Sequence, residues 1–158
     1  MLRPSIVMAA IAACAVACQP ASTELTEGQR AAITDTIVQL MDELADAGRA
    51  RDFDRIRAAY SENPVSVTNG VIIEDFDARF ELTRGFFESL RTLDGSSRNV
   101  HLEVLAPDAV VVTQNDDIFW TDTAGTEGEA HTAWTGVFRR IDGEWKIIYS
   151  HESWPLPE

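Results

Sequence analysis

The chain has few cysteines, and both lie near its beginning. Cys14 and Cys18 are the two cysteines among 158 residues. Arg3 precedes a run of small apolar residues that is too short to span a bilayer, because a membrane helix needs about 20 of them. We therefore expect residues 1–17 to be an export signal. Its removal would leave Cys18 as the one thiol of the mature chain, with no cysteine to pair with.

Cys18 is itself a candidate attachment site. The residues Ala15 to Ala17 fit the small-residue cleavage rule and resemble the lipobox of bacterial lipoproteins, in which the following cysteine is acylated. Residues 11–14 match as well, but cleavage there would leave a very short apolar region. We expect Cys18 to be lipidated, residues 18–25 to be a tether, and the protein to face the periplasm from the outer membrane. The alternative is an ordinary cleaved signal with an incidental cysteine.

Basic side chains are also scarce. The sequence has 13 Lys and Arg against 26 Asp and Glu, a formal net charge of −13. Binding to nucleic acid and to anionic lipid headgroups depends on Lys and Arg, so neither is expected. Contact with a membrane is expected only through the lipid anchor. The acids are scattered along the chain and do not by themselves identify a cationic ligand.

Histidines are few and widely spaced. His101, His131 and His151 form no close pair with metal-ligand spacing. His131 lies near Glu127 and Glu129, an arrangement more typical of a solvated loop than of a metal site. The sequence has no glycine-rich phosphate loop, serine elbow or Cys–His nucleophile. We therefore expect neither a metal nor a cofactor.

The pattern of residues 26–158 predicts one domain that contains three helices. The first begins at Thr26, where Gln29 completes a capping box, and ends at Gly48. Asp52 caps a short second helix and Asp75 caps a third. The apolar faces of these two helices are formed by Phe53, Ile56 and Tyr60, and by Phe76, Phe80, Thr83, Phe87 and Leu90.

The remaining segments predict strands. Asn69-Gly70 is a hairpin signal between strands at 65–68 and 71–73. Residues 93–99 are expected to be a loop. Four strands follow at 100–106, 109–121, 131–141 and 144–154, with a bulge or bend at 115–117. The fold class is therefore α+β, with helices packed on one face of a curved, mostly antiparallel sheet.

The last hairpin carries the candidate site. A two-residue turn at Asp142-Gly143 fixes the register, so that residue numbers of paired positions sum to 285. Trp134 would then face His151, and Gly136 would leave room for the ring of Tyr149. This face is apolar at one end and polar at the other, and we expect it to look into a cavity.

Residues 142–153 resemble the closing strand of SnoaL-like members of the nuclear-transport-factor-2-like superfamily, which includes ketosteroid-isomerase-like proteins. A "dG-x-W-x-I" run there leads to a His-x-Ser ending, and the earlier elements fit in order over residues 27–154. The resemblance implies a cone with one open end. It also implies a range of functions, from isomerases, dehydratases and polyketide cyclases to non-catalytic association domains, so function must be argued from the site.

Two functions remain open on the sequence. In the first, the cone binds a small apolar or aromatic molecule, and His151 acts as an acid–base catalyst. In the second, the domain is a non-catalytic module for homodimerisation or protein interaction in the envelope, and His151 is structural. The resemblance implies that an enzyme of this type would use an aspartate or a His–Asp pair, and the directions of Asp116, Asp117 and Asp122 are unreadable across the expected bulge. The expected ligand-binding residues are Trp134, Tyr149, Ser153, Tyr60 and Trp120.

Overall fold

The computed structural model describes residues 24–154. The expected export signal and Cys18 therefore lie outside the described residues, as do most of the tether and residues 155–158. Between residues 24 and 154, no helix is both long enough and apolar enough to cross a membrane. The helices and strands, in chain order, are α1 (Glu27–Ala50), α2 (Phe53–Ala58), β1 (Tyr60–Thr68), β2 (Val71–Ile73), α3 (Phe76–Glu88), β3 (Leu90–Ala106), β4 (Ala109–Asp122), β5 (Glu127–Ile141) and β6 (Glu144–Ser153).

The helix starts follow the predicted caps. Thr26 accepts a hydrogen bond from the Gln29 amide, and the Gln29 side chain accepts from the Thr26 amide, which confirms the capping box. The side chains of Asp52 and Asp75 cap α2 and α3 by accepting from the Arg55 and Ala78 amides. Helix α1 continues two residues beyond Gly48 and ends where Arg51 adopts a left-handed conformation, at φ 56°.

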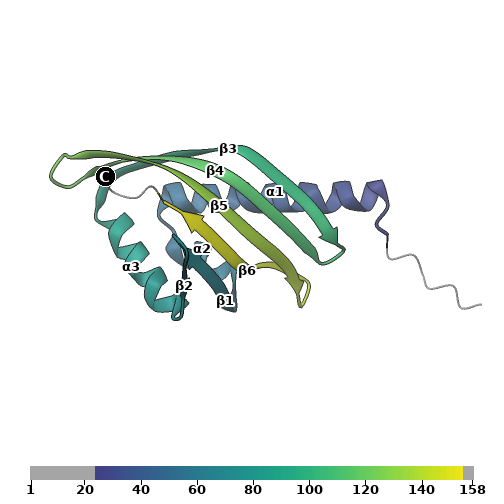
Figure 1. Ribbon diagram of the computed structural model, residues 1–158. Coiled ribbons are helices and arrows are strands. Elements are labelled where there is room, and N and C mark those ends of the chain that lie inside the picture. Colours follow the sequence, from purple (N-terminus) through teal and green to yellow (C-terminus); the bar gives the residue numbers. More distant parts are fainter. Residues whose placement is uncertain (1–23, 155–158) are drawn as a thin grey trace, which may run out of the picture.

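The six strands form one sheet in the order β2-β1-β6-β5-β4-β3. All neighbours are antiparallel except β1 and β6, which run parallel. The sheet curves along its length, and α1 lies across one of its faces (Figure 1). The predicted α+β cone with one open end is confirmed, and the sheet does not close on itself.

Two details of the strand prediction are wrong. Residues 93–99 are not a loop, because β3 begins at Leu90 and pairs with β4 over almost its whole length. The expected bulge at residues 115–117 is absent, since β4 pairs with β5 without a break. The irregularity lies on the neighbouring strand instead, between Arg98 and His101, where Asn99 has a φ of 52°.

The core lies between α1 and the sheet. Its fully buried members come from α1, β4, β5 and β6 and are Ile37, Val110, Val112, Phe138 and Ile147. Burial of each such side chain stabilises the fold by roughly 1.5–3 kcal/mol. Arg30 adds a hydrogen bond from α1 to the Val104 carbonyl, at 2.8 Å.

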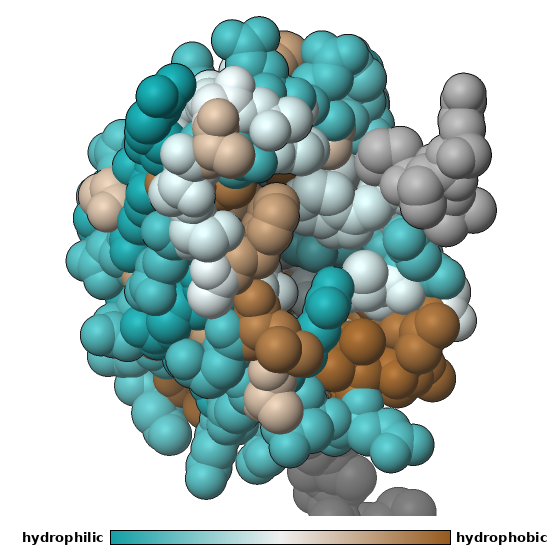
Figure 2. Space-filling view, turned by 90° about the vertical axis from the view of Figure 1, so that its left-hand side faces the viewer, coloured by the Kyte–Doolittle hydropathy of each residue, from teal (hydrophilic) through white to brown (hydrophobic). Residues whose placement is uncertain are grey.

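Helix α3 packs much less tightly than α1. None of its residues is buried, and Leu82 and Phe86 are exposed. It is held by ring contacts to α2 and by two ion pairs, Arg57–Asp77 and Arg84–Asp54, each at 2.7 Å. Figure 2 shows the end of the molecule that carries α3, where a recess lies between hydrophobic and hydrophilic side chains. This end is the mouth of the cone.

Candidate functional site

The register of the β5–β6 hairpin decides which residues line the cone. The predicted pairs are confirmed from Ile141–Glu144 to Phe138–Ile147. The register then shifts by one residue, so that Val137 pairs with Tyr149 and Trp134 pairs with Glu152. The rest of the predicted pairing is wrong, because one extra residue on β6 forms a bulge. A one-residue slip moves every following side chain to the other face.

The face towards the helices therefore differs from the predicted one on β6. The β5 residues Phe138, Gly136, Trp134 and Thr132 all point inward and are buried, as the alternation of burial along the strand shows. On β6 the inward residues after Ile147 are Ser150 and Glu152. Ser150 is 2% exposed and hydrogen-bonds the buried Ser66 on β1, with 3.2 Å between their hydroxyl oxygens.

Three predicted site residues lie on the opposite face of the sheet. His151 pairs with Thr135 on one side and with Val67 on the other, Tyr149 with Val137, and Ser153 with Ala133. The prediction that His151 faces Trp134 across a cavity is wrong because of the bulge. Neither His151 nor Tyr149 nor Ser153 shares a face with Trp134, so the geometry does not bring these three predicted residues into the hollow.

The two tryptophans of the predicted site both face inward and lie against glycines. A Cβ atom on Gly136 would be 2.1 Å from Cη2 of Trp134, and one on Gly128 would be 2.3 Å from Cε2 of Trp120. The space at Gly136 is therefore occupied by the indole of Trp134, and not by the ring of Tyr149 as predicted. Trp120 contacts Phe86 of α3, with 6.2 Å between ring centroids. The indoles are held flat along the inner wall.

Tyr60 lies inward as predicted, although from the first position of β1 and not from the end of α2. Its ring packs against Phe76 and Phe80 of α3, with centroid distances of 4.9 and 6.5 Å. Burial, and secondly the charge of Glu152, raises the pKa of Tyr60 to about 12, although hydrogen bonding with Ser150 and Trp134 acts in the other direction. The hydroxyl is therefore protonated, and able to donate, across the neutral range.

Two inward carboxyl groups were not predicted. Glu152 Oε2 accepts from the Trp154 indole at 3.1 Å. Burial raises the pKa of Glu152, the charge of Asp116 raises it further, and the Trp154 hydrogen bond and the charge of Arg79 oppose the rise. No sequence signal for this position was available, because the predicted register placed Glu152 outside.

Asp116 points inward from β4, where it pairs with Thr132. Its Oδ1 accepts from the Ser97 hydroxyl at 2.6 Å and from Gln114 Nε2 at 2.7 Å. Burial raises the pKa of Asp116, against the effect of these two hydrogen bonds. The strict alternation of β4 places Asp116 on the inner face, and that alternation would have been readable had no bulge been expected there.

The other two aspartates whose directions the sequence left open are held by contacts of their own. Asp117 points to the outer face, where Arg98 donates to it at 2.8 and 3.0 Å and His131 lies 2.7 Å away. Hydrogen bonds from Arg98 and then His131 lower the pKa of Asp117 to about 2. Asp122 accepts from the Thr126 amide within the turn before β5. His131 thus pairs with Asp117, and not with the glutamates next to it in sequence. No group of potential metal ligands occurs among the residues that the structure describes.

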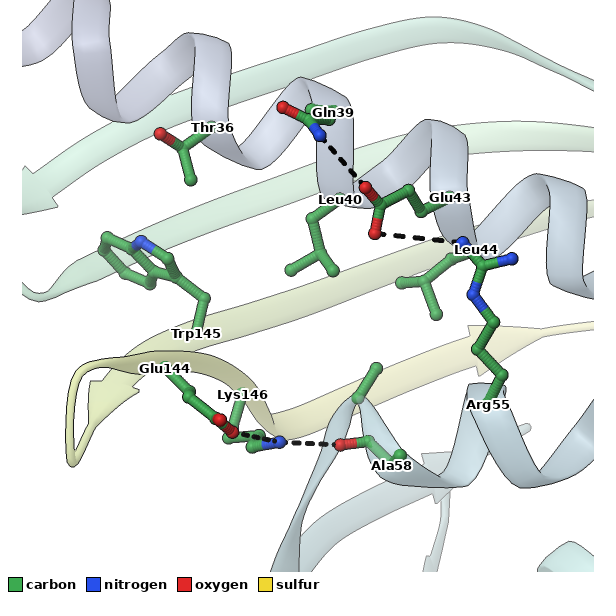
Figure 3. Close-up of a pocket in the computed structure, with 11 residues that line it drawn as sticks. Thr36, Gln39, Leu40, Glu43, Leu44, Arg55, Ala58, Glu144, Trp145 and Lys146 are labelled. Atoms are coloured by element: carbon green, nitrogen blue, oxygen red, sulfur yellow. Dashed lines mark hydrogen bonds and ion pairs between the residues drawn. The ribbon is translucent and has the colours of Figure 1, made fainter.

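A second hollow lies between α1, α2 and the start of β6, on the side of the sheet that faces the helices (Figure 3). It is a groove of about 430 Å³ with Leu40, Leu44 and Trp145 among its lining residues. At one side Gln39 donates to Glu43 at 3.0 Å. At the other, Lys146 donates to the Ala58 carbonyl at 2.9 Å. The groove is an open depression next to the core, and none of its lining residues belongs to the predicted site.

The sequence matches the model of the SnoaL-like domain family over residues 37–157. This covers most of the chain, which therefore belongs to that family. No curated protein matches the sequence.

Solved structures of the same fold come from functionally different proteins. The association domain of calcium/calmodulin dependent protein kinase II from C. elegans is 20% identical, with a TM-score of 0.64 over 78% of this chain and 97% of that one. A hexachlorocyclohexane dehydrochlorinase, LinA-type3 from Novosphingobium barchaimii, is 13% identical, with a TM-score of 0.69 over 83% and 92%. An uncharacterised protein with a cystatin-like fold from Caulobacter vibrioides is 16% identical, with a TM-score of 0.63 over 78% and 90%. At these identities the likeness concerns the fold alone.

Proposed function

We propose that this protein is exported, is anchored to the envelope by a lipid on Cys18, and binds a small apolar or aromatic molecule in its cone. The observation that carries the binding proposal is the partial exposure of the aromatic side chains at the mouth. Tyr60, Phe76, Phe80 and Phe87 touch one another or α2, yet none of them is buried to the extent of the core. Apolar side chains that gather around a recess without filling it are typical of ligand pockets.

The polar groups of the pocket are few and fixed in place, which is also typical of a binding site. Tyr60 supplies a hydroxyl donor, and Ser150 and the Trp134 indole lie close to it. Asp116 and Glu152 supply the acidic groups. If the site carries out acid–base chemistry, these two carboxyls are the candidates, because His151 lies on the other face of the sheet.

The binding proposal is tested by calorimetric titration of the purified protein with 4-phenylbutanol, a small neutral aromatic probe. We expect Trp134→Leu to weaken binding at least fivefold, because the indole forms part of the inner wall. Trp145→Leu is the matched control, since Trp145 lines the separate groove of Figure 3 between α1, α2 and β6. Weaker binding in the control alone would place the ligand in that groove, and no binding to the unaltered protein would refute the proposal.

The anchor is tested separately by metabolic labelling with a radioactive fatty acid in a bacterial host. We expect Cys18→Ser to abolish the label and Cys14→Ser to leave it, because cleavage before Cys18 would remove Cys14 with the signal. Persistent labelling of Cys18→Ser would contradict the proposed attachment site.

Self-association through the outer sheet face is a second candidate function. Over β1, β2, β4, β5 and β6, two rows of paired residues on this face contain no acidic side chain and no Lys or Arg: Val111, Val137, Tyr149 and Val65, and Thr113, Thr135, His151, Val67 and Ile72. On β3 the rows continue to Glu103 and His101. Val65 is 48% and Ile72 67% exposed. Charged residues are depleted from the centres of protein interfaces, so a strongly acidic chain could pair through such a surface. Sedimentation velocity tests this candidate. We expect the unaltered protein to be a dimer and Tyr149→Asp to be a monomer, and a monomeric unaltered protein would exclude the candidate.

A further inference from the structure

We propose that the ligand of the cone carries a positively charged amino group, which lies beside Asp116 and Glu152, on an apolar body that lies among the rings of α3. This inference rests on the proposed binding function and adds the chemical class of the ligand. Three features support it. Each carboxyl group has one oxygen that accepts no side-chain hydrogen bond, neither carboxyl has an ion-pair partner among the described residues, and aromatic rings lie at the same end of the domain.

Each of the two carboxyl groups is fixed by one oxygen and leaves the other available. Asp116 Oδ1 holds the hydrogen bonds from Ser97 and Gln114, and Glu152 Oε2 holds the one from Trp154. Between residues 24 and 154, no side chain donates a hydrogen bond to Asp116 Oδ2 or Glu152 Oε1. The groups are therefore held in position, with an acceptor left for a ligand.

The described part of the chain supplies no ion-pair partner to either carboxyl. The outward Asp117 shows the contrast, because Arg98 and His131 both lie against it. Arg79, on the exposed side of α3, influences Glu152 only through its charge, without an ion pair among the described residues. Burying an unpaired carboxylate is costly, and a cation that enters the site would offset that cost.

Among the aromatic side chains at this end, Tyr60 lies close enough to Glu152 for the carboxyl charge to raise its pKa, and aromatic rings have faces that suit a cation. Tyr60, Phe76 and Phe80 form a three-ring cluster with centroid distances between 4.9 and 6.5 Å. The chain already places a cation on this type of surface, since the Arg57 guanidinium lies 5.2 Å from the centre of Phe76 and that of Arg84 lies 5.9 Å from Phe53. An ammonium group between aromatic rings and carboxylates gains from both interactions.

The same features disfavour other ligand charges. A carboxylate or phosphate in the pocket would be repelled by two half-buried acids, with no basic side chain among the described residues paired to them to compensate. A neutral molecule would gain the apolar contacts alone. The order of affinity expected for one apolar body is therefore amine, then alcohol, then carboxylate.

The test uses three probes with the same phenylbutyl body: 4-phenylbutylamine, 4-phenylbutanol and 4-phenylbutyrate. Equilibrium dialysis of each probe against the purified protein at neutral pH gives three affinities. We expect the amine to bind at least tenfold more tightly than the alcohol, and the carboxylate to bind most weakly. Glu152→Gln and Asp116→Asn should each reduce the amine-to-alcohol ratio at least threefold, because each removes one negative charge beside the amino group.

Glu129→Gln is the matched control, because Glu129 is exposed on the same sheet and pairs with the outward Phe119. Its amine-to-alcohol ratio should equal that of the unaltered protein. Circular dichroism confirms that each variant is folded. Equal binding of amine and alcohol, or an unchanged ratio in both Glu152→Gln and Asp116→Asn, would overturn the charge inference and leave the apolar pocket standing. If none of the three probes binds, the proposed binding function fails as well.

Discussion

A substitution of Gly136 by alanine tests the inner wall of the cone most directly. An alanine Cβ would be 2.1, 2.6 and 2.9 Å from three atoms of the Trp134 ring. Ordinary contacts begin at about 3.4 Å. The nearest ring atom would therefore have to move by about 1.3 Å, away from a site where Trp134 is 9% exposed and packs on Phe138.

Overpacking of this kind costs roughly 1–3 kcal/mol, whereas replacing a strand glycine by alanine otherwise gains about 0.5–1 kcal/mol. We expect Gly136→Ala to lower the free energy of unfolding by about 1–2 kcal/mol. Urea titration followed by circular dichroism measures the loss, and the emission of Trp134 should shift because its ring is displaced.

Gly85→Ala is the matched control for this substitution. Gly85 lies within α3, and a Cβ there would meet nothing within 4 Å. Because alanine is the better helix former, this variant should gain about 0.8–1 kcal/mol. If Gly136→Ala were as stable as the unaltered protein with unchanged emission, the indole would not lie on Gly136 and the wall described above would be incorrect.

Two further predictions concern pH, and their signs are opposite. The pKa of Glu152 is raised in the folded state, so the folded protein becomes more stable as the pH falls through that pKa towards the value of the unfolded chain. Glu152→Gln should therefore raise the melting temperature at pH 7, and this gain should disappear near pH 4. An equal gain at both pH values would show that the charge of Glu152 is not the cause. The pKa of Asp117 is lowered to about 2, so its contribution to the stability of the fold is present at neutral pH and is lost as the pH falls from about 4 to 2. Asp117→Asn should therefore lower the melting temperature at pH 7, and the variant should differ little from the unaltered protein near pH 2. A difference that stayed constant down to pH 2 would contradict the pairing with Arg98 and His131.

The elements that the sequence predicted well are those with local signals. Thr26, Asp52 and Asp75 each begin a helix because their side chains accept from an amide three residues ahead. The turns at Asn69-Gly70 and Asp142-Gly143 have positive φ at both positions, which these residue types tolerate. Such features depend on a few neighbouring residues, so they can be read without knowledge of the tertiary fold.

The strand from Leu90 to Ala106 shows the opposite case. Residues 93–99 contain Asp, Gly, Ser, Arg and Asn, a composition that favours loops. They nevertheless form a strand, because β4 offers a continuous partner and side chains such as Ser97 and Arg98 bond to aspartates across it. The stabilising contacts come from residues about 19 positions further along the chain, so local composition could not reveal them.

The inward residues of β6 were predicted wrongly because this strand contains one additional, bulged residue. Both possible registers satisfy the turn at Asp142-Gly143 and keep Phe138 against Ile147 in the core. They differ only beyond that pair, where one register brings His151 inward and the other brings Ser150 and Glu152. The observed register hydrogen-bonds Ser150 to Ser66 and places Val67 beside His151 on the outer face, which depends on the parallel pairing with β1. Whether β6 places the imidazole of His151 or the carboxyl of Glu152 on the inner face therefore depends on β1, a strand more than 80 residues earlier in the chain. For this reason a motif that predicts the fold from its last strand cannot by itself assign the residues that face a ligand.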